Sequence, residues 1–249
     1  MTHIEKGMKA IDVRKELQSR ADPDKVEILQ RFFKTGPGQY GEADIFIGVM
    51  VPQSRKVAKK FSQLPLAEVR TLLYSRIHEE RLVALLILAW RYRYSSSSTS
   101  EKEEIVKFYL DNINQVNNWD LVDLSAPNIL GAHLLADNRG TRELLYKLAE
   151  SDNVWERRIA IVATHYFIRN GDFSDTLKIV EILLQDRHDL IHKAAGWMLR
   201  EVGKRDAAAE EAFLEKYYNV MPRTMLRYAI ERLPESKRRR YKKKPIDMA

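Results

Sequence analysis

The chain has 249 residues, of which 45% are hydrophobic and 31% charged, and its formal net charge is +7. This length is sufficient to bury a substantial core. No apolar run reaches the roughly 20 residues that span a bilayer, and Met1–Lys15 is too charged for a secretory signal. We therefore expect an intracellular, cytoplasmic protein. The sequence contains no cysteine, which excludes thiolate metal sites, thiol nucleophiles and disulfides.

The positive charge is concentrated near the C-terminus. Seven basic residues with no acid among them account for the whole net charge of +7: Lys237, Arg238, Arg239, Arg240, Lys242, Lys243 and Lys244. The remaining residues are neutral overall, so a nucleic-acid face among them would require segregated charge. We expect residues 237–249 to form a basic, disordered tail.

Helix formers dominate the composition, and alternating β-branched runs are few, which predicts an almost wholly helical chain. Asp22-Pro23 offers an N-cap with proline at the first helical position, and Ser100 with Glu103 has capping-box spacing. The predicted helices cover 8–20, 23–34, a stretch starting at 52, 66–74, 78–91, 101–116, a short stretch from 119, 127–135, 141–150, 153–170, 174–185, 189–203, 207–218 and 222–233.

Three further segments are interpreted from their composition. The apolar run Ile45–Met50 resembles a strand, but no partner strand is evident, so we interpret it as a buried approach to the next helix. The stretch from His78 to Arg91 is strongly apolar and is predicted to be an inner helix. Ser95–Ser98 is predicted to be a polar connection.

The predicted helices form pairs of roughly 35 to 45 residues, a period typical of helical repeats. Trp119, Trp155 and Trp197 are 36 and 42 residues apart, so they fall at related places in successive pairs. The pattern predicts an all-α, HEAT-like repeat solenoid, a single domain over residues 1–236, with one concave surface. A plain helical bundle stays open, because periodicity does not exclude it.

The common catalytic motifs are missing. The sequence has no Gly-rich phosphate loop, no G-x-S-x-G elbow and no H-E-x-x-H. His188 and His192 are four residues apart, a spacing that can bind a metal. No third ligand is apparent, so we interpret them as two surface histidines on a helix and expect no metal and no cofactor.

Trp119 and Asp123 present a ring and a carboxylate together. Asn118 is a plausible N-cap, which places Trp119 in the first turn and Asp123 four residues on, on the same face. Asp120 is a rival carboxylate that points away from Trp119 on a helix. Taken alone, this segment is better explained as a core tryptophan beside an acid that complements the helix dipole.

Two further groupings combine an aromatic ring with cations. Trp155 and Arg158 share a helix face, and Lys193, Trp197 and Arg200 lie along one stripe. Each grouping alone is typical of a cation lying over a core aromatic ring. Three groupings in successive units suggest a nucleic-acid surface, where rings pack and cations bind phosphate.

These blocks resemble the AlkD-type DNA alkylation repair glycosylases. The resemblance covers about 25–233 and rests on three motifs in the same order: Trp119-Asp120-x-Val122-Asp123, Trp155-x-x-Arg158 and His192-Lys193-Ala194-x-Gly196-Trp197-x-Leu199-Arg200-Glu201. The segment Gly48-x-x-x-Pro52-x-x-Arg55 is similar to the family's early helix opening.

The resemblance implies a helical-repeat fold whose concave face binds duplex DNA. It also implies excision of positively charged N3- or N7-alkylated purines without a cofactor and without deep base flipping, by a monomer that is nucleoid-associated when bound to DNA. Asp123 would be the catalytic carboxylate, Trp119 and Trp197 would pack against the nucleotide, and Arg158 would bind phosphate and help position Asp123. The expected DNA-binding residues are Phe32, Arg55, Lys56, Lys59, Trp155, Lys193 and Arg200.

The residue types suit this chemistry. An alkylated purine already carries positive charge, and cleavage of its glycosidic bond develops oxocarbenium character on the sugar. A fixed carboxylate stabilises that charge. Phe32 departs from the family pattern, in which a tyrosine is common, so affinity or substrate range is in doubt. A DNA-binding protein of impaired activity and a protein–protein scaffold are the alternatives.

Overall fold

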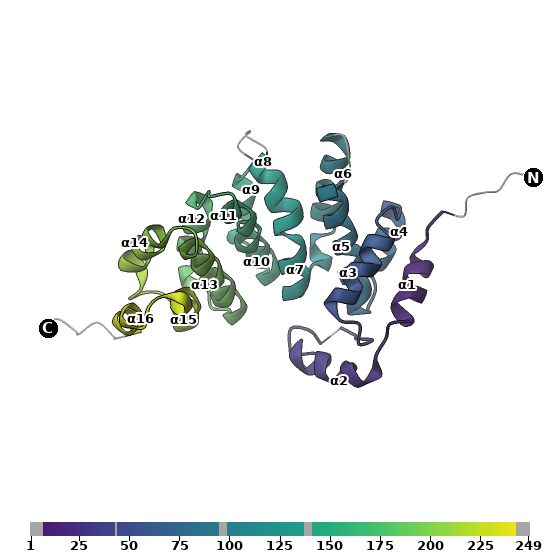
Figure 1. Cartoon of the computed structure of the whole chain (residues 1–249), viewed down its shortest axis with the longest axis horizontal. Coiled ribbons are helices and arrows are strands. Elements are labelled where there is room, and N and C mark those ends of the chain that lie inside the picture. Colours follow the sequence, from purple (N-terminus) through teal and green to yellow (C-terminus); the bar gives the residue numbers. More distant parts are fainter. Residues whose placement is uncertain (1–6, 43, 95–98, 137–140, 243–249) are drawn as a thin grey trace, which may run out of the picture. The chain divides into compact units, whose positions relative to one another are not determined.

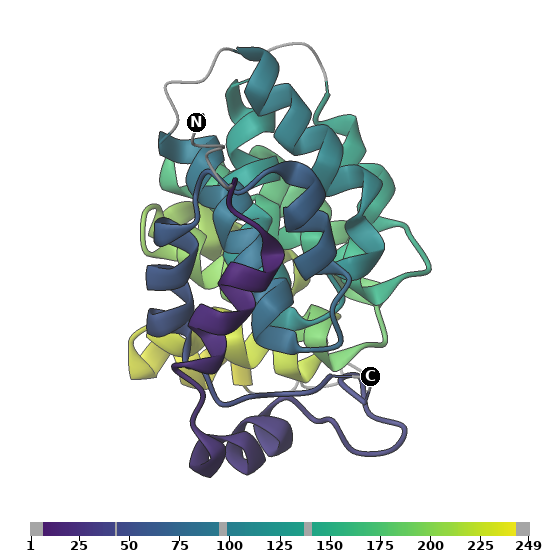
Figure 2. The same ribbon diagram turned by 90° about the vertical axis from the view of Figure 1, so that its right-hand side faces the viewer.

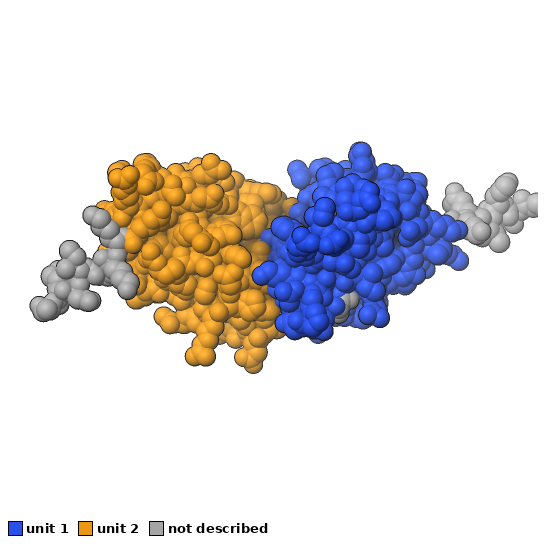
Figure 3. All heavy atoms as spheres, turned by 90° about the horizontal axis from the view of Figure 1, so that it is seen from below, with its two compact units in different colours: residues 1–125 blue, residues 126–249 orange. Residues whose placement is uncertain are grey.

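The computed structural model describes residues 7–42, 44–94, 99–136 and 141–242. The chain falls into two compact units, residues 1–125 and 126–249 (Figure 3). Within the described ranges there are helices and no named strand, and the single bridge outside strands pairs Ile45 with Ile77. The all-α prediction is confirmed. No helix in these ranges is long and apolar enough to cross a membrane.

Unit 1 contains seven α-helices and a short 3-10 turn within its described residues (Figure 1). Their bounds are α1 Ala10–Gln18, α2 Pro23–Phe32, α3 Val51–Lys60, α4 Leu66–Leu73, α5 His78–Tyr94, α6 Thr99–Asp111, η1 Ile113–Gln115 and α7 Trp119–Ser125. The helix expected over 101–116 is shorter and begins at Thr99, so Ser100 does not cap it. Ser95–Ser98 lies outside the described residues.

The core of unit 1 forms around α5. This helix is buried from His78 to Ala89, and α1, α3, α4 and α7 pack against it. A helix that is apolar on every side has to be covered on every side. The prediction of an inner helix is therefore confirmed.

The segment Ile45–Met50 leads into α3 without forming a strand. The buried Glu79 carboxylate accepts hydrogen bonds from the backbone amides of Ile47, Gly48 and Val49 at 2.9–3.2 Å. Gly48 has φ +86°, and a Cβ there would lie 2.0 Å from the Asp22 carbonyl oxygen. The prediction of a buried approach to the helix holds in large part, although Ile45 and Met50 are exposed.

Helix α2 lies at the edge of unit 1, as both ribbon views show (Figures 1 and 2). Asp22 caps it by accepting from the amide of Asp24, and Pro23 stands at its first position, as predicted. None of its residues is buried, and Ile28 and Phe32 are exposed by 66% and 62%. The helix therefore presents apolar side chains to solvent.

Unit 2 continues the helical pattern. Its elements are η2 Pro127–Gly131, a π-helical turn, then α8 Ala132–Ala136, α9 Glu143–Ala149, α10 Val154–Ala163, α11 His165–Arg169, α12 Ser174–Ile182, η3 Leu183–Gln185, α13 Asp189–Gly203, α14 Ala207–Tyr217, α15 Arg223–Ala229, η4 Ile230–Arg232 and α16 Glu235–Lys242. The long helix predicted over 153–170 is divided at Thr164, whose hydroxyl bonds to the Ile161 carbonyl.

Helix α13 is the central helix of unit 2, packed by α10, α14 and α15. At Gly196 an added Cβ would meet the Met225 carbonyl oxygen at 2.3 Å and the Tyr228 Cβ at 2.6 Å. Only glycine allows α15 to approach this closely. The residue that precedes Trp197 therefore fixes the spacing between these two helices.

The prediction of a disordered tail is wrong at its start, because residues 237–242 belong to α16. Tyr241 is only 2% exposed and its hydroxyl donates to Glu215. Lys237 and Arg240 pair with Glu211 and Glu215. A buried ring and neutralising acids from α14 offset the repulsion that the run of cations suggested. Residues 243–249 lie outside the described ranges.

Candidate functional site

Helix α7 positions Trp119 and Asp123. Asn118 directly precedes it, and its amide oxygen accepts from the backbone amide of Trp119 at 2.8 Å while its carbonyl accepts from that of Val122. Trp119 and Asp123 are both half-buried and stand one turn apart. The ring and the carboxylate therefore lie on one face of a short, firmly anchored helix.

An aromatic stack holds Trp119 from the side of α2. The ring of Phe33 is parallel to the Trp119 ring at 5.0 Å, and the exposed Phe32 meets Trp119 edge-on at 5.5 Å. Phe33 also stacks on Phe46 at 4.9 Å, and Phe46 stacks on His78 at 4.5 Å. The structure thus brings together two predicted residues, Phe32 and Trp119.

Beneath this stack lies a buried polar network. His78 bonds through Nδ1 to Asp44 at 2.9 Å and through Nε2 to Asp120 at 2.8 Å. The Asp44 carboxylate is also bound by the Arg81 guanidinium and, at 2.8 Å, by the Asn118 amide. Asn118 therefore joins the network directly to the start of α7.

The two carboxylates keep His78 protonated. Burial strongly opposes the charged imidazolium, but the charges and hydrogen bonds of Asp120 and Asp44 outweigh it and raise the pKa of His78 to about 9. The pKa of Asp44 is lowered: burial opposes its charge, and the His78 and Arg81 contacts outweigh that effect. At neutral pH the network is an ionic cluster fully enclosed by unit 1.

Asp120 is consequently engaged in holding the fold. It is 4% exposed, and besides His78 it contacts the amide of Leu121. Asp123 is half-buried and is the more accessible carboxylate of the pair. Sequence reasoning missed the His78 network. The available signal was four consecutive ionisable residues, 78–81, that directly precede the apolar run 82–90 of the same helix.

Three predicted DNA-binding residues lie on α3. Arg55, Lys56 and Lys59 are exposed, and the Lys59 amine lies 5.4 Å from the centre of the Trp90 ring. These side chains extend from a helix that packs on α5. They form a basic surface of unit 1.

In unit 2, Trp155 and Arg158 lie near the start of α10. Asn153 caps this helix by accepting from the Trp155 amide at 2.9 Å. Trp155 is half-buried. Arg158 is only 5% exposed and donates to the Leu190 carbonyl at 2.6 Å. Arg158 thereby ties α10 to the first turn of α13.

Helix α13 carries the other predicted residues. The half-buried Trp197 donates its indole N–H to Glu201 at 3.2 Å and lies 5.3 Å from the His165 ring. The pKa of His165 is lowered to about 4 by burial and by the charge of Arg169. Trp197 therefore packs against the neutral His165 ring and bonds to the Glu201 carboxylate, and these two contacts hold the indole in place.

The cations of α13 have acidic partners. Lys193 pairs with Asp189 at 2.7 Å, and Arg200 pairs with Glu231. Exposed pairs of this kind contribute little to stability and exchange readily for other partners. Lys193 can therefore turn to an anion at low cost, whereas the Arg200 side chain, 18% exposed, is held more firmly.

The histidine pair of α13 has a structural role. His188 accepts from the amide of Leu190 and caps the helix, and His192 bonds to the Asp186 carbonyl at 2.6 Å. Among the described residues, no group of three His, Cys, Asp or Glu side chains is placed to hold a metal ion.

Comparison with known proteins identifies the family. The family model for DNA alkylation repair enzymes matches residues 13–233, and the chain belongs to this family. A solved structure titled "Predicted DNA alkylation repair enzyme from Enterococcus faecalis" is similar, with a TM-score of 0.68 and 16% identity, covering 87% of this chain and 98% of that chain. The all-α helical-repeat fold is thus shared. Among curated proteins, none matches the sequence.

Proposed function

We propose that this protein is a DNA N-glycosylase that excises positively charged N3- or N7-alkylated purines from duplex DNA. The observation that carries the proposal is the family match over residues 13–233. That range contains the four predicted catalytic residues: Trp119, Asp123, Arg158 and Trp197. DNA is accordingly the partner, and no cofactor is required.

Asp123 is proposed as the catalytic carboxylate. Departure of a cationic purine leaves oxocarbenium character on the sugar, and an ionised carboxylate stabilises that charge as it develops. The same carboxylate can orient the attacking water. The engagement of Asp120 with His78 supports Asp123 over its neighbour.

The two tryptophans are proposed to bind the damaged nucleotide. Indole faces attract cationic and polarised C–H groups, and Trp119 and Trp197 are both half-buried, each with its ring fixed by neighbours. Fixed rings lose little conformational entropy on binding. Arg158, which is buried and donates to the Leu190 carbonyl, is proposed to contribute its positive charge toward a backbone phosphate.

Asp123→Asn tests the proposal. We expect single-turnover release of N7-methylguanine or N3-methyladenine from alkylated duplex to fall about 10²- to 10³-fold, because the charge stabilisation is lost. Binding to a duplex that carries an abasic analogue should persist. Chromatography of the released base and fluorescence anisotropy provide the two measurements.

Asp111→Asn is the matched control. It removes the same charge from an exposed position on α6, where Asp111 pairs with Lys107, and it should leave the rate unchanged. Release by Asp123→Asn at the wild-type rate would overturn the assigned mechanism. If the wild-type protein binds the abasic duplex and releases no base, it is instead a DNA-binding protein of impaired activity. The replacement of the family's tyrosine by Phe32 is compatible with that alternative.

A further inference from the structure

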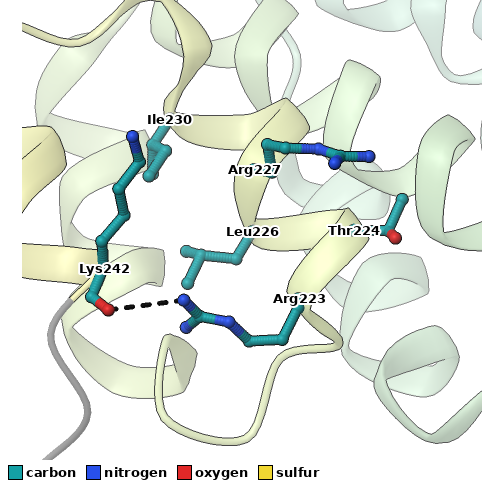
Figure 4. A pocket seen from close by; sticks show the side chains of 6 residues that line it. All are labelled: Arg223, Thr224, Leu226, Arg227, Ile230 and Lys242. Atoms are coloured by element: carbon teal, nitrogen blue, oxygen red, sulfur yellow. Dashed lines mark hydrogen bonds between the residues drawn. The ribbon is translucent and has the colours of Figure 1, made fainter.

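A pocket of about 310 Å³ lies between α15 and α16 in unit 2 (Figure 4). Its lining combines three basic residues with two apolar ones and a threonine: Arg223, Arg227, Lys242, Leu226, Ile230 and Thr224. Figure 4 shows Leu226 between the Arg223 side chain and Ile230. The pocket therefore combines an apolar surface with cations at its rim, and the Arg227 side chain extends away from Arg223 and Lys242 (Figure 4).

The shape of the pocket depends on α16. The Arg223 guanidinium donates to the Lys242 carbonyl at 3.3 Å, which joins α15 to the last residue of α16. The family match ends at residue 233, so Lys242 belongs to a segment beyond it. Tyr241, buried beside Lys242, anchors the end of this helix.

The three cations of the pocket differ from four of the cations on α16 in making no ion pair with an acid. Four other cations of α16 are in ion pairs with acids of α14 or α16: Lys237, Arg238, Arg239 and Arg240. No ion pair within 4.0 Å joins Arg223, Arg227 or Lys242 to an acid among the described residues. Like charges near an apolar surface repel one another, and a bound anion would relieve that repulsion.

We infer that this pocket binds a backbone phosphate of duplex DNA. The inference rests on the proposed function, which makes DNA the substrate. Guanidinium groups bind phosphate oxygens through paired N–H donors, and an ammonium group adds a point charge. Helix α15 packs against α13, which carries Trp197 and the predicted DNA-binding residues Lys193 and Arg200. Helix α16 adds a phosphate contact to this chain.

The test is the salt dependence of binding by the full chain. A triple variant, Arg223→Gln with Arg227→Gln and Lys242→Gln, should reduce the slope of log affinity against log salt by about one and weaken binding severalfold. The loss should be equal on undamaged and abasic-analogue duplexes, because phosphate contacts do not report on the base. A charge-retaining triple variant, Arg223→Lys with Arg227→Lys and Lys242→Arg, should keep the slope.

A second triple variant controls for net charge. Lys237→Gln with Arg239→Gln and Arg240→Gln removes three charges from α16 outside the pocket, and we expect it to change the slope much less. Equal losses in the two triples would show that α16 acts by diffuse charge and would overturn the pocket. Thermal melting should show that both triples remain folded. If the pocket triple fails to fold, the charge-retaining triple and the single variant Lys242→Gln are measured in its place. An unchanged salt slope for Lys242→Gln would then count against the site.

Inorganic phosphate distinguishes a free anion from DNA. One outcome is that millimolar phosphate raises the melting temperature of the wild-type protein but not that of the pocket triple, while the two proteins have the same salt slope for DNA binding. In that case the site binds free phosphate, and its assignment to DNA is wrong. Base release is measured separately. If no base is released, the proposed glycosylase activity is wrong. The salt slopes of the wild-type protein and the pocket triple can still be compared, so the phosphate site is tested independently.

Discussion

Phe32 lies at the exposed edge of the Trp119 ring, at a centroid distance of 5.5 Å. Its own side chain is 62% exposed and has no hydroxyl. A phenyl ring supports the indole by an edge contact but offers no hydrogen bond to DNA. We therefore expect the chemistry at this one position to affect the affinity for DNA.

Phe32→Tyr should strengthen binding to an abasic-analogue duplex about fivefold, because one added hydrogen bond contributes about 1 kcal/mol. The exposed site should tolerate the change within about 0.5 kcal/mol of the free energy of unfolding. Anisotropy titration and urea unfolding provide the two values. Phe32→Leu, which removes the ring, should weaken binding. If both variants bind as the wild type does, Phe32 does not touch DNA.

At the scale of elements, the His78 network joins three parts of unit 1. Asp44 precedes α3, His78 and Arg81 open α5, and Asp120 lies in α7. Removing one member of a buried ionic cluster leaves the others uncompensated. The position of α7, and with it that of Asp123, therefore depends on the charge of one imidazole.

The network predicts a pH dependence of stability. The pKa of His78 is raised from 6.5 to about 9 in the folded chain, so the stabilisation is complete below pH 6.5 and is lost as the pH rises through 9. The corresponding free energy is on the order of 3 kcal/mol. Urea unfolding between pH 6 and pH 9.5 should show this fall.

His78→Gln should flatten that dependence as well as lower the stability at pH 6. His133→Gln, in unit 2, should keep the wild-type slope. A stability of the wild type that is constant between pH 6 and pH 9.5 would show that His78 is not protonated between Asp44 and Asp120.

At the scale of the whole molecule, the proposed excision of a cationic purine determines whether a metal ion or a thiol is needed. A cationic purine leaves without a Lewis acid, and the 249 residues include no cysteine. We expect base release to be unchanged by EDTA and by a thiol-modifying reagent. A rate that falls with EDTA and recovers on adding a divalent ion would contradict the proposed mechanism. Dialysis against EDTA followed by the base-release assay makes the measurement.

The distribution of charge is also a property of the whole chain. The cations of α16 balance the acids of α14 in part, so the net charge of +7 overstates the positive field that α16 presents to DNA. Electrostatic attraction at long range follows unpaired charge. The pocket cations have no ion pair within 4.0 Å among the described residues, so their charge is not balanced in this way.

Local patterns in the sequence determined the helices and many of their ends. Asp22-Pro23, Asn153 and the stretch from Asp189 to Gly203 specify caps and boundaries through interactions within a few residues. The apolar run after His78 specified an inner helix for the same reason. The order of the tryptophan motifs was enough to indicate the family that the match over residues 13–233 confirms, while the assigned roles of Asp123 and the tryptophans stay predictions.

Only the tertiary structure decided which polar groups are enclosed. His78 meets Asp44 and Asp120 across 34 and 42 residues of sequence, and Tyr241 reaches Glu215 across 26. Contacts of such separation leave no periodic signal, so the buried network and the order of α16 were not predicted. The sequence by itself determined the helices, which depend on interactions between neighbouring residues, and it indicated the family through the order of its motifs. The enclosed ions and the basic pocket depend on which helices pack together.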